Sequence, residues 1–495
     1  MDRAGALSYL GAGSRVANTM KREHVPGGLG WRVAILLMAT ACVGRDWPVS
    51  PLGTQALHGR ALPEIAALLP APDPRDGDYA KTGGLRAVLA RVDSVASSLR
   101  AAMAEAVARG EEVEVAKSQY WGAVTPFAST EQLDAARLVS PLSPPVQIQS
   151  ISFDDQQYHL GVRATLPLDL SGRIGAEVRG AAGAHHASLA DVEDLRRRIL
   201  NSAAQLFRGL QTLGGVRSAL QTKRDALLAH LTSAKEAVRV GRMAHVEELR
   251  LLAERDKVLA QLAGLDGQDA ALRARLAALM RVDSYGTKIK PPAVTPPAID
   301  SERMPWSHRP DLVAARFRVE SAAEAVRASA ARRLPQVALQ GSAVYNRGYS
   351  TDGDGLGQVG LFVEWPVFDG GLRAAKQRAA RARYGASLQR LQRLTDAARA
   401  EVTAAQSTWR AVGRRYNAAL SAAKAARETV AIQARRFQEG RLSAADLVDA
   451  EATRSNAEAE AVASLVAWWS ADDALQLARG RFAVGYVRKS QEVER

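Results

Sequence analysis

The stretch WPVFDGGLR at residues 365–373 decides the fold, because it leads from one kind of regular structure into another without a loop. The residues that overlap its start, GQVGLFVEWPVF (357–368), alternate in the manner of a strand, and no proline follows Pro366. Proline ends the strand, and Gly370 with Gly371 lets the backbone turn where a side chain would clash. The stretch therefore predicts a strand that passes directly into a very long helix.

The proline-free tract after this turn has the period of a coiled coil. Its apolar positions recur every ~3.5 residues, which is the coiled-coil value and not the 3.6 of a lone helix. They are Leu388, Leu391, Leu394, Ala398, Val402, Ala405, Trp409, Val412, Tyr416, Leu420 and Ala423. A continuous helix over 373–437 would be about 95 Å long at ~1.5 Å per residue. Gly440 ends it in a left-handed conformation, and Ser443 or Ala444 begins a return helix of about forty residues.

The chain repeats itself at a constant shift of 199 residues. The shift aligns three pairs of turn residues, which are Pro167 with Pro366, Gly172 with Gly371, and Gly241 with Gly440. Each copy has the same order of a helix, a hairpin, a long helix and a return helix, so the sequence predicts two homologous halves. Between them lies KIKPPAVTPPAID (288–300), whose four prolines predict an extended connector.

The elements of the two halves can be assigned in parallel. In the second half we expect a helix over 309–335 and strands over 336–345 and 357–368. In the first half we expect a helix through 113–126 and a hairpin that ends in YHLGVRATLPLDL (158–170). The prolines that bracket the hairpins are farther apart in the first half, so its loop should be longer.

These patterns divide the chain into six segments. They are a signal peptide (1–41, with a true start possible at Met20), an extended N-terminal segment (42–85), the first repeat (86–287), the linker (288–300), the second repeat (301–484) and a C-terminal tail (485–495).

The signal peptide is indicated by a basic start after Met20 and an apolar run over 33–41, directly before Cys42. Two interpretations fit. As a lipobox, the run makes Cys42 a lipidated first residue; as a plain cleavage box, it leaves Cys42 incidental. Because Cys42 is the only cysteine, no disulfide can form within the chain, and both interpretations place the mature protein outside the cytoplasm.

Composition and motifs argue against nucleic acid, cofactors, metals and catalysis. The net charge of +14 comes from arginines spread among acidic residues, which is typical of a solvated helical surface. The glycine motif at 355–360 opens a strand and not the helix that phosphate binding needs. The acidic loop at 352–355 has too few ligands for calcium, and His185–His186 has no partner at metal-ligand spacing. We therefore expect a protein that is not an enzyme.

The chain resembles the TolC-like outer membrane efflux proteins. The resemblance rests on RPDLVAARFRVESAAEAVRASAARRLPQVAL (309–339), PVFDGGLR (366–373) and RRFQEGRLSAADLVDAEATRSNAEAE (435–460), and it extends over nearly the whole mature chain. CVGRDWPVSP (42–51) is similar to the start of the lipoprotein branch of the family, which usually has proline where Arg45 stands.

The resemblance implies a mainly α fold with a small β part, assembled as a homotrimer. Each chain would give four strands to a shared twelve-stranded barrel in outer-membrane lipid and its helices to a periplasmic tunnel. Four strands cannot close a barrel alone, and an open sheet edge in lipid is very costly, so physics also favours sharing. The implied partners are a periplasmic adaptor protein and an inner-membrane pump, either proton-driven or of the ABC type.

The resemblance also indicates where function should concentrate. Asp446 and Asp449 occupy positions that ring the periplasmic aperture in this family, with Glu247 as the counterpart of Asp446 in the first repeat. As an alternative, both aspartates are simply solvated. A latch that closes the aperture would pair Glu247 with Phe437, Arg441 or Arg242.

Trp121 and Trp365 lie at strand–helix junctions, as expected for an aromatic belt at the periplasmic membrane interface. Core packing is the alternative for each of them.

The predicted function is a passive exit channel of a tripartite export system. Small toxic molecules and a secreted protein, as in type I secretion, remain open as its substrate. A periplasmic coiled-coil scaffold or adaptor without a barrel is the alternative from another class.

Overall fold

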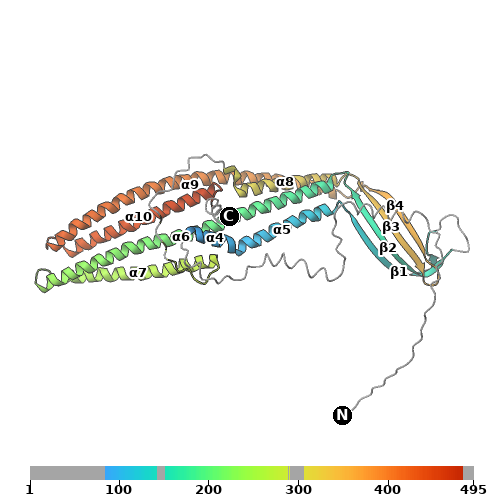
Figure 1. The fold of residues 1–495 in the computed structure, drawn as a ribbon. Helices are drawn as coiled ribbons and strands as arrows, with labels where there is room; N and C mark the ends of the chain where they lie inside the picture. Colours follow the sequence, from blue (N-terminus) through green and yellow to red (C-terminus); the bar gives the residue numbers. More distant parts are fainter. Residues whose placement is uncertain (1–83, 142–150, 288, 290–291, 293–305, 483–495) are drawn as a thin grey trace, which may run out of the picture. The chain divides into compact units, whose positions relative to one another are not determined.

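The computed structural model describes residues 84–141, 151–287, 289, 292 and 306–482. The predicted signal peptide, Cys42, most of the linker and the C-terminal tail lie outside the described residues. The first repeat contains α4 (Leu85–Val95), α5 (Ser97–Ser118), β1 (Ala123–Leu138), β2 (Phe153–Leu168), α6 (Arg173–Arg239) and α7 (His245–Met280). The second contains the short η2 (Trp306–His308), α8 (Pro310–Ala331), β3 (Gln336–Gly348), β4 (Asp354–Glu364), α9 (Leu372–Gln438) and α10 (Ala444–Ala478) (Figure 1).

The bounds of the long helices follow the 199-residue repeat of the sequence. Helices α6 and α9 both have 67 residues, and their first residues, Arg173 and Leu372, differ by the same 199 positions as their last residues do. Helices α7 and α10 begin at His245 and Ala444, again 199 apart. The predicted long helix and the return helix are therefore confirmed, and α6 and α9 are each ~100 Å long at ~1.5 Å per residue.

The chain divides into two compact units, and each is described by itself. The described part of the smaller unit, residues 124–141, 151–164 and 341–360, holds most of the sheet; the larger unit holds the helices.

The four strands form one antiparallel sheet in the order β1-β2-β3-β4. The middle pair, β2 and β3, comes from different repeats, and His159 Nδ1 lies 2.8 Å from Asn346 Oδ1 across it. Along β2 the apolar Tyr158, Leu160 and Val162 alternate with polar residues, yet all three are exposed. The sheet thus has an exposed apolar face, and β1 and β4 are its two outer strands.

One prediction for the first hairpin was wrong. We expected a helix through residues 113–126, but α5 ends at Ser118 and β1 begins at Ala123, so that Pro126 lies within a strand. Proline is tolerated there because β1 is an outer strand. Gly122 makes the change of direction: its φ is 67°, and a Cβ added to it would meet the carbonyl oxygen of Thr165 at 1.8 Å. The longer loop between the first two strands was predicted correctly.

The helical unit is built around α6, which packs against α5, α7, α8 and α10, while α9 packs against α10 and α8. Its buried residues are mostly alanine and leucine, which allow close helix approach. One apolar cluster joins α4, α6 and α7 around residues such as Val88, Leu210 and Leu276. A second joins the ends of the four long helices around Leu227, Leu251 and Leu447.

Among the described residues, none of the helices combines the length and the apolar character needed to cross a membrane.

Candidate functional site

The candidate site lies at the two turns where the long helices reverse, between α6 and α7 and between α9 and α10. Gly241 has a φ of 71° and Gly440 has a φ of 72°, and an added Cβ would meet no atom within 4 Å at either position. Glycine is therefore needed at these turns for its backbone conformation and not for space. Both turns are as the sequence predicted.

The acidic residues of the second turn project from the start of α10. The hydroxyl of Ser443 accepts a hydrogen bond from the backbone N–H of Asp446 at 3.2 Å, and it donates to the Asp446 carboxylate at 2.7 Å. This reciprocal pair caps the helix, because the first N–H groups of a helix have no partner within it. Asp446 and Asp449 are both exposed, so their negative charges face away from the core of the chain.

Glu247 has partners other than those expected for a latch. Its Oε2 accepts a hydrogen bond from the backbone N–H of Ala444 at 2.7 Å, and its Oε1 accepts one from Arg250 at 3.1 Å. Its carboxylate therefore caps α10, although Glu247 itself belongs to α7. An unpaired N–H and the positive end of the helix dipole explain why a carboxylate is held there. This contact ties the two turns, and so the two repeats, together.

Within one chain, the positions of the other residues predicted for the latch also differ from those expected. Phe437 is only 2% exposed and lies in the apolar cluster with Leu227 and Leu447, where its ring is 6.2 Å from that of His230. Arg441 is exposed and pairs with Glu439 at 3.3 Å, and Arg242 is exposed. The structure of one chain therefore shows Phe437 as a core residue, because its phenyl ring gains more by burial than by solvation.

A buried polar cluster near this turn was missed by the sequence analysis. Glu451 is 1% exposed, and its two carboxylate oxygens lie 3.3 Å from His230 Nε2 and 2.8 Å from Arg454 Nη2. A signal was present, since Ala444, Leu447 and Glu451 follow the heptad spacing of a core stripe. A carboxylate in a core position needs a buried partner.

The strand–helix junctions form the second group of predicted positions. Gly370 and Gly371 have φ angles of 63° and 87°, as a sharp turn requires. The carboxylate of Asp369 accepts hydrogen bonds from the backbone N–H groups of Gly371 and Arg373 at 3.0 and 3.1 Å. The Arg373 guanidinium also donates to it at 2.6 Å, which lowers the pKa of Asp369.

The first repeat builds the same cap with an acid one position earlier. Asp169 accepts hydrogen bonds from the backbone N–H groups of Ile174 and Gly175 at 3.0 and 2.8 Å. The 199-residue shift aligns Asp169 with Phe368, not with Asp369. The first N–H groups of a helix need a hydrogen-bond acceptor outside the helix. Each repeat therefore supplies this acceptor from an aspartate at a different position.

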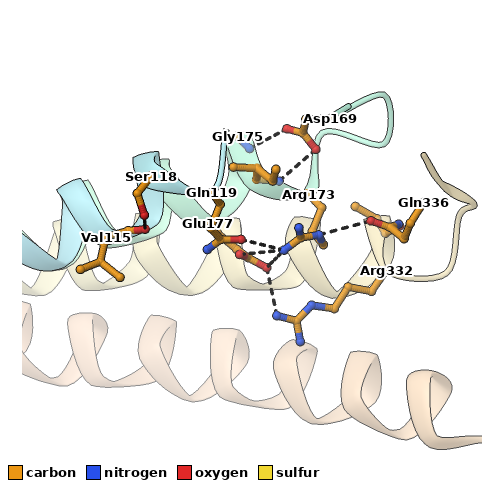
Figure 2. A network of polar contacts seen from close by, with 11 residues as sticks. Val115, Ser118, Gln119, Asp169, Arg173, Gly175, Glu177, Arg332 and Gln336 are labelled. Atoms are coloured by element: carbon orange, nitrogen blue, oxygen red, sulfur yellow. Dashed lines mark hydrogen bonds and ion pairs between the residues drawn. The ribbon is translucent and has the colours of Figure 1, made fainter. Parts of the chain in front are cut away.

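A polar network locks the first junction, and Figure 2 shows it from close by. Arg173 donates to Gln119 at 3.0 Å, to Glu177 at 3.1 Å and to Gln336 at 3.3 Å, and Arg332 donates to Glu177 at 3.0 Å. The network thus joins the end of α5, the start of α6, the end of α8 and the start of β3. Burial acts to raise the pKa of Glu177, but the hydrogen bonds from Arg332 and Gln119 and the charge of Arg173 outweigh it, so the pKa is lowered.

The two tryptophans lie between strand and helix, as predicted, and neither is packed in the core of the chain. Trp121 is 60% exposed and Trp365 is 58% exposed. The indole N–H of Trp365 donates to the carbonyl oxygen of Arg333 at 3.2 Å, which fixes the ring next to the end of α8. Val367 and Phe368, beside Trp365, are even more exposed. Their position at a membrane interface remains a prediction.

Comparison with known proteins gives a family match over part of the chain and a fold over most of it. Residues 306–481 match the family model of the outer membrane efflux proteins. The chain is 28% identical over 185 residues to the outer membrane protein MdtQ of Escherichia coli (strain K12), whose name refers to multidrug resistance. This match covers 36% of the chain and spans only 38% of the length of that relative.

Solved structures are similar over most of the chain. The outer membrane protein VceC of Vibrio cholerae is 21% identical, with a TM-score of 0.68 over 80% of this chain and 96% of that one. The outer membrane channel CmeC of Campylobacter jejuni is 15% identical, with a TM-score of 0.69 over 84% of this chain and 90% of that one. At this level of identity, these two structures show the fold.

Proposed function

We propose that this chain is the passive exit channel of a trans-envelope export system, because residues 306–481 match the family model of the outer membrane efflux proteins and because the fold is similar to that of solved outer-membrane channels. The family and the solved relatives are outer-membrane proteins, and this chain is assigned to the outer membrane accordingly. Substrate would pass from an inner-membrane pump through a periplasmic adaptor into the channel. Energy would come from the pump, and the channel itself performs no chemistry.

The observation that carries the proposal is the sheet, with its exposed apolar face and with outer strands that, among the described residues, each pair on one side only. Leu361 on β4 is 63% exposed and Leu160 on β2 is 62% exposed, which would be unfavourable in water. Apolar residues that alternate with polar ones along a strand suit a wall with lipid on one side and water on the other. The outer strands β1 and β4 have free N–H and C=O groups that would pair in a closed barrel.

A homotrimer accounts for the free outer edges of β1 and β4. Three copies would contribute twelve strands, and a β4 strand of one copy would pair with β1 of the next. The helices would continue as a tunnel through the periplasm. A coiled-coil scaffold without a barrel leaves the exposed apolar face without a role, so the channel is the better supported function.

The helix turns would form the periplasmic aperture in this assembly. Exposed Asp446 and Asp449 from each copy would gather around the axis and favour cations over anions. Replacing both by asparagine should lower the cation preference of the channel in planar bilayers, because the negative ring is lost. The control is Glu428→Gln, which removes an exposed acid of α9 outside this turn. It should change the cation preference little.

The substrate belongs to this proposal as well. Small toxic molecules are favoured by the partial match to MdtQ, which is named for multidrug resistance. A strain that lacks the gene should then become more sensitive to several drugs, with an unchanged set of secreted proteins. Loss of one secreted protein without drug sensitivity would favour type I secretion instead.

The channel itself is tested by fractionation. The protein should be found in outer-membrane fractions as a trimer that dissociates on heating in detergent. A compact soluble monomer would contradict the proposed function.

A further inference from the structure

The first ~8 turns of α9, residues 372–399, carry a charge imbalance that the proposed aperture does not explain. Residues 372–399 contain eight basic residues and one acidic residue, whereas the equivalent residues 173–200 of α6 contain five basic and four acidic ones. Three of the basic residues, Lys376, Arg383 and Arg390, are spaced by seven positions. At the coiled-coil period they form one straight line along the helix, which we call the basic stripe.

The basic stripe is exposed and lacks acidic partners. All three side chains are exposed, and within the described part of the chain no carboxylate lies within ion-pair distance of them. The one acid of residues 372–399, Asp396, is hydrogen-bonded to Gln392 at 3.1 Å and faces another side of the helix. Among the described residues, these three positive charges are therefore left without a counter-charge.

A groove shows which side of the helical unit the stripe faces. It has a volume of about 520 Å³, and residues of α5, α6, α8 and α9 line it. Arg383 lines it from α9, together with Arg318 of α8, Asp191 of α6 and the pair Glu105 and Arg109 of α5, which lie 3.3 Å apart. Helix α5 packs against α6, α6 against α8, and α8 against α9, so a groove that reaches both α5 and α9 lies on the concave side of these four helices. The stripe therefore follows the concave side.

The repeat gives independent support for this direction. The 199-residue shift aligns the stripe with Glu177, Ala184 and Asp191 of α6, and the last two line the same groove. The equivalent positions Ala184 and Arg383 thus face one groove, and of these two only Arg383 is charged.

The acids of α6 are neutralised, however, and the bases of α9 are not. Glu177 pairs with Arg173 and Arg332, and Asp191 pairs with Arg318. Helix α9 therefore leaves this surface charged, whereas its counterpart α6 does not. The excess charge of this surface is therefore positive.

We propose that the concave surface with Lys376, Arg383 and Arg390 lines the conducting tunnel and gives it a preference for organic anions, such as solutes with carboxylate, sulfonate or phosphate groups. The inference rests on the proposed function and names a substrate class for it. A charged wall of low dielectric constant concentrates counter-ions along its length. At physiological salt the effect reaches about 8 Å, so it acts on solutes close to the wall.

The acidic aperture is a separate filter. From Arg390 to the last residue of α9 is ~70 Å along the helix at ~1.5 Å per residue, far beyond the range of screened charges. The permeability of the whole channel combines both regions, so the effect of the stripe is measured best after the aperture has been neutralised.

The test uses the purified full-length protein in planar bilayers under a salt gradient. In a D446N/D449N background, the triple variant K376Q/R383Q/R390Q should lower the anion-to-cation permeability ratio by about threefold or more. The matched control R378Q/R381Q/R399Q removes three exposed charges of the same kind from the opposite side of α9 and should leave the ratio unchanged. Trimer content on native gels should be the same for all variants.

The outcomes separate the two proposals. A protein that forms no channel in any variant contradicts the proposed function. A channel whose permeability ratio responds to the control set, or to neither set, contradicts the basic stripe alone. Efflux of an anionic and a cationic dye of similar size from vesicles gives a second readout, in which only the anionic dye should be slowed by the triple variant.

Discussion

At the scale of single residues, the buried Glu451 shows how strongly one side chain depends on its partners. It lies between His230 and Arg454 at a core position of α10, with 1% of its surface exposed. An ion pair in the interior is costly to break, because the remaining partner keeps its charge or its polar groups without compensation.

Glu451→Ala is therefore expected to lower the free energy of unfolding by about 3 kcal/mol, since it leaves the half-buried Arg454 without its carboxylate. Thermal unfolding followed by circular dichroism would measure the change. Glu439→Ala removes an exposed partner of Arg441 and is expected to cost at most ~1 kcal/mol. Equal effects of the two substitutions would contradict a structural role for the buried cluster.

Glu177 gives a prediction about pH. Its pKa is lowered in the folded chain, so its carboxylate stabilises the fold above its ordinary pKa, and this stability is lost as the pH falls through the lower folded value. Below about pH 4.3, the ordinary value of a glutamate, the wild type should lose thermal stability more steeply than Glu177→Gln. Glu105→Gln is the control and should follow the wild type. Parallel curves for wild type and Glu177→Gln would show that the network in Figure 2 does not depend on this charge.

At the scale of elements, the turn glycines and the helix glycines should respond in opposite ways. Gly440 has a φ of 72°, which is strained for alanine, whereas Gly264 lies inside α7 with open space around it. Gly440→Ala should destabilise the chain by roughly 1 kcal/mol, and Gly264→Ala should stabilise it by a similar amount through helix propensity. Urea unfolding of both variants measures the two signs, and a stabilising Gly440→Ala would contradict the left-handed turn.

Much at this scale was predictable from the sequence. The lengths of α6 and α9 follow from a local period, from the absence of proline and from glycine at each end. The start of β1 was not predictable in the same way, because Pro126 is acceptable only in an outer strand, and the order of strands depends on contacts between the two repeats.

At the scale of the whole molecule, substitutions on the two faces of the sheet should have different effects. Leu361 lies on the exposed apolar face of β4, while Gln358 alternates to the other face. If lipid covers the apolar face, Leu361→Arg should cost about 2–4 kcal/mol near the middle of the bilayer and reduce the amount of trimer in outer-membrane fractions. Gln358→Arg should leave that amount nearly unchanged. Equal yields of the two variants would argue against lipid on this face.

The sequence by itself determined the repeated unit, because strand alternation, helix period and turn glycines act between neighbours in the chain. Only the tertiary structure decided which charges meet. Glu247 caps the helix that begins at Ala444, 197 positions away, and His230 reaches Glu451 across 221 positions. Such contacts follow from the packing of α10 against α6 and α7, where buried polar groups need hydrogen-bond partners. A local sequence pattern does not specify that packing.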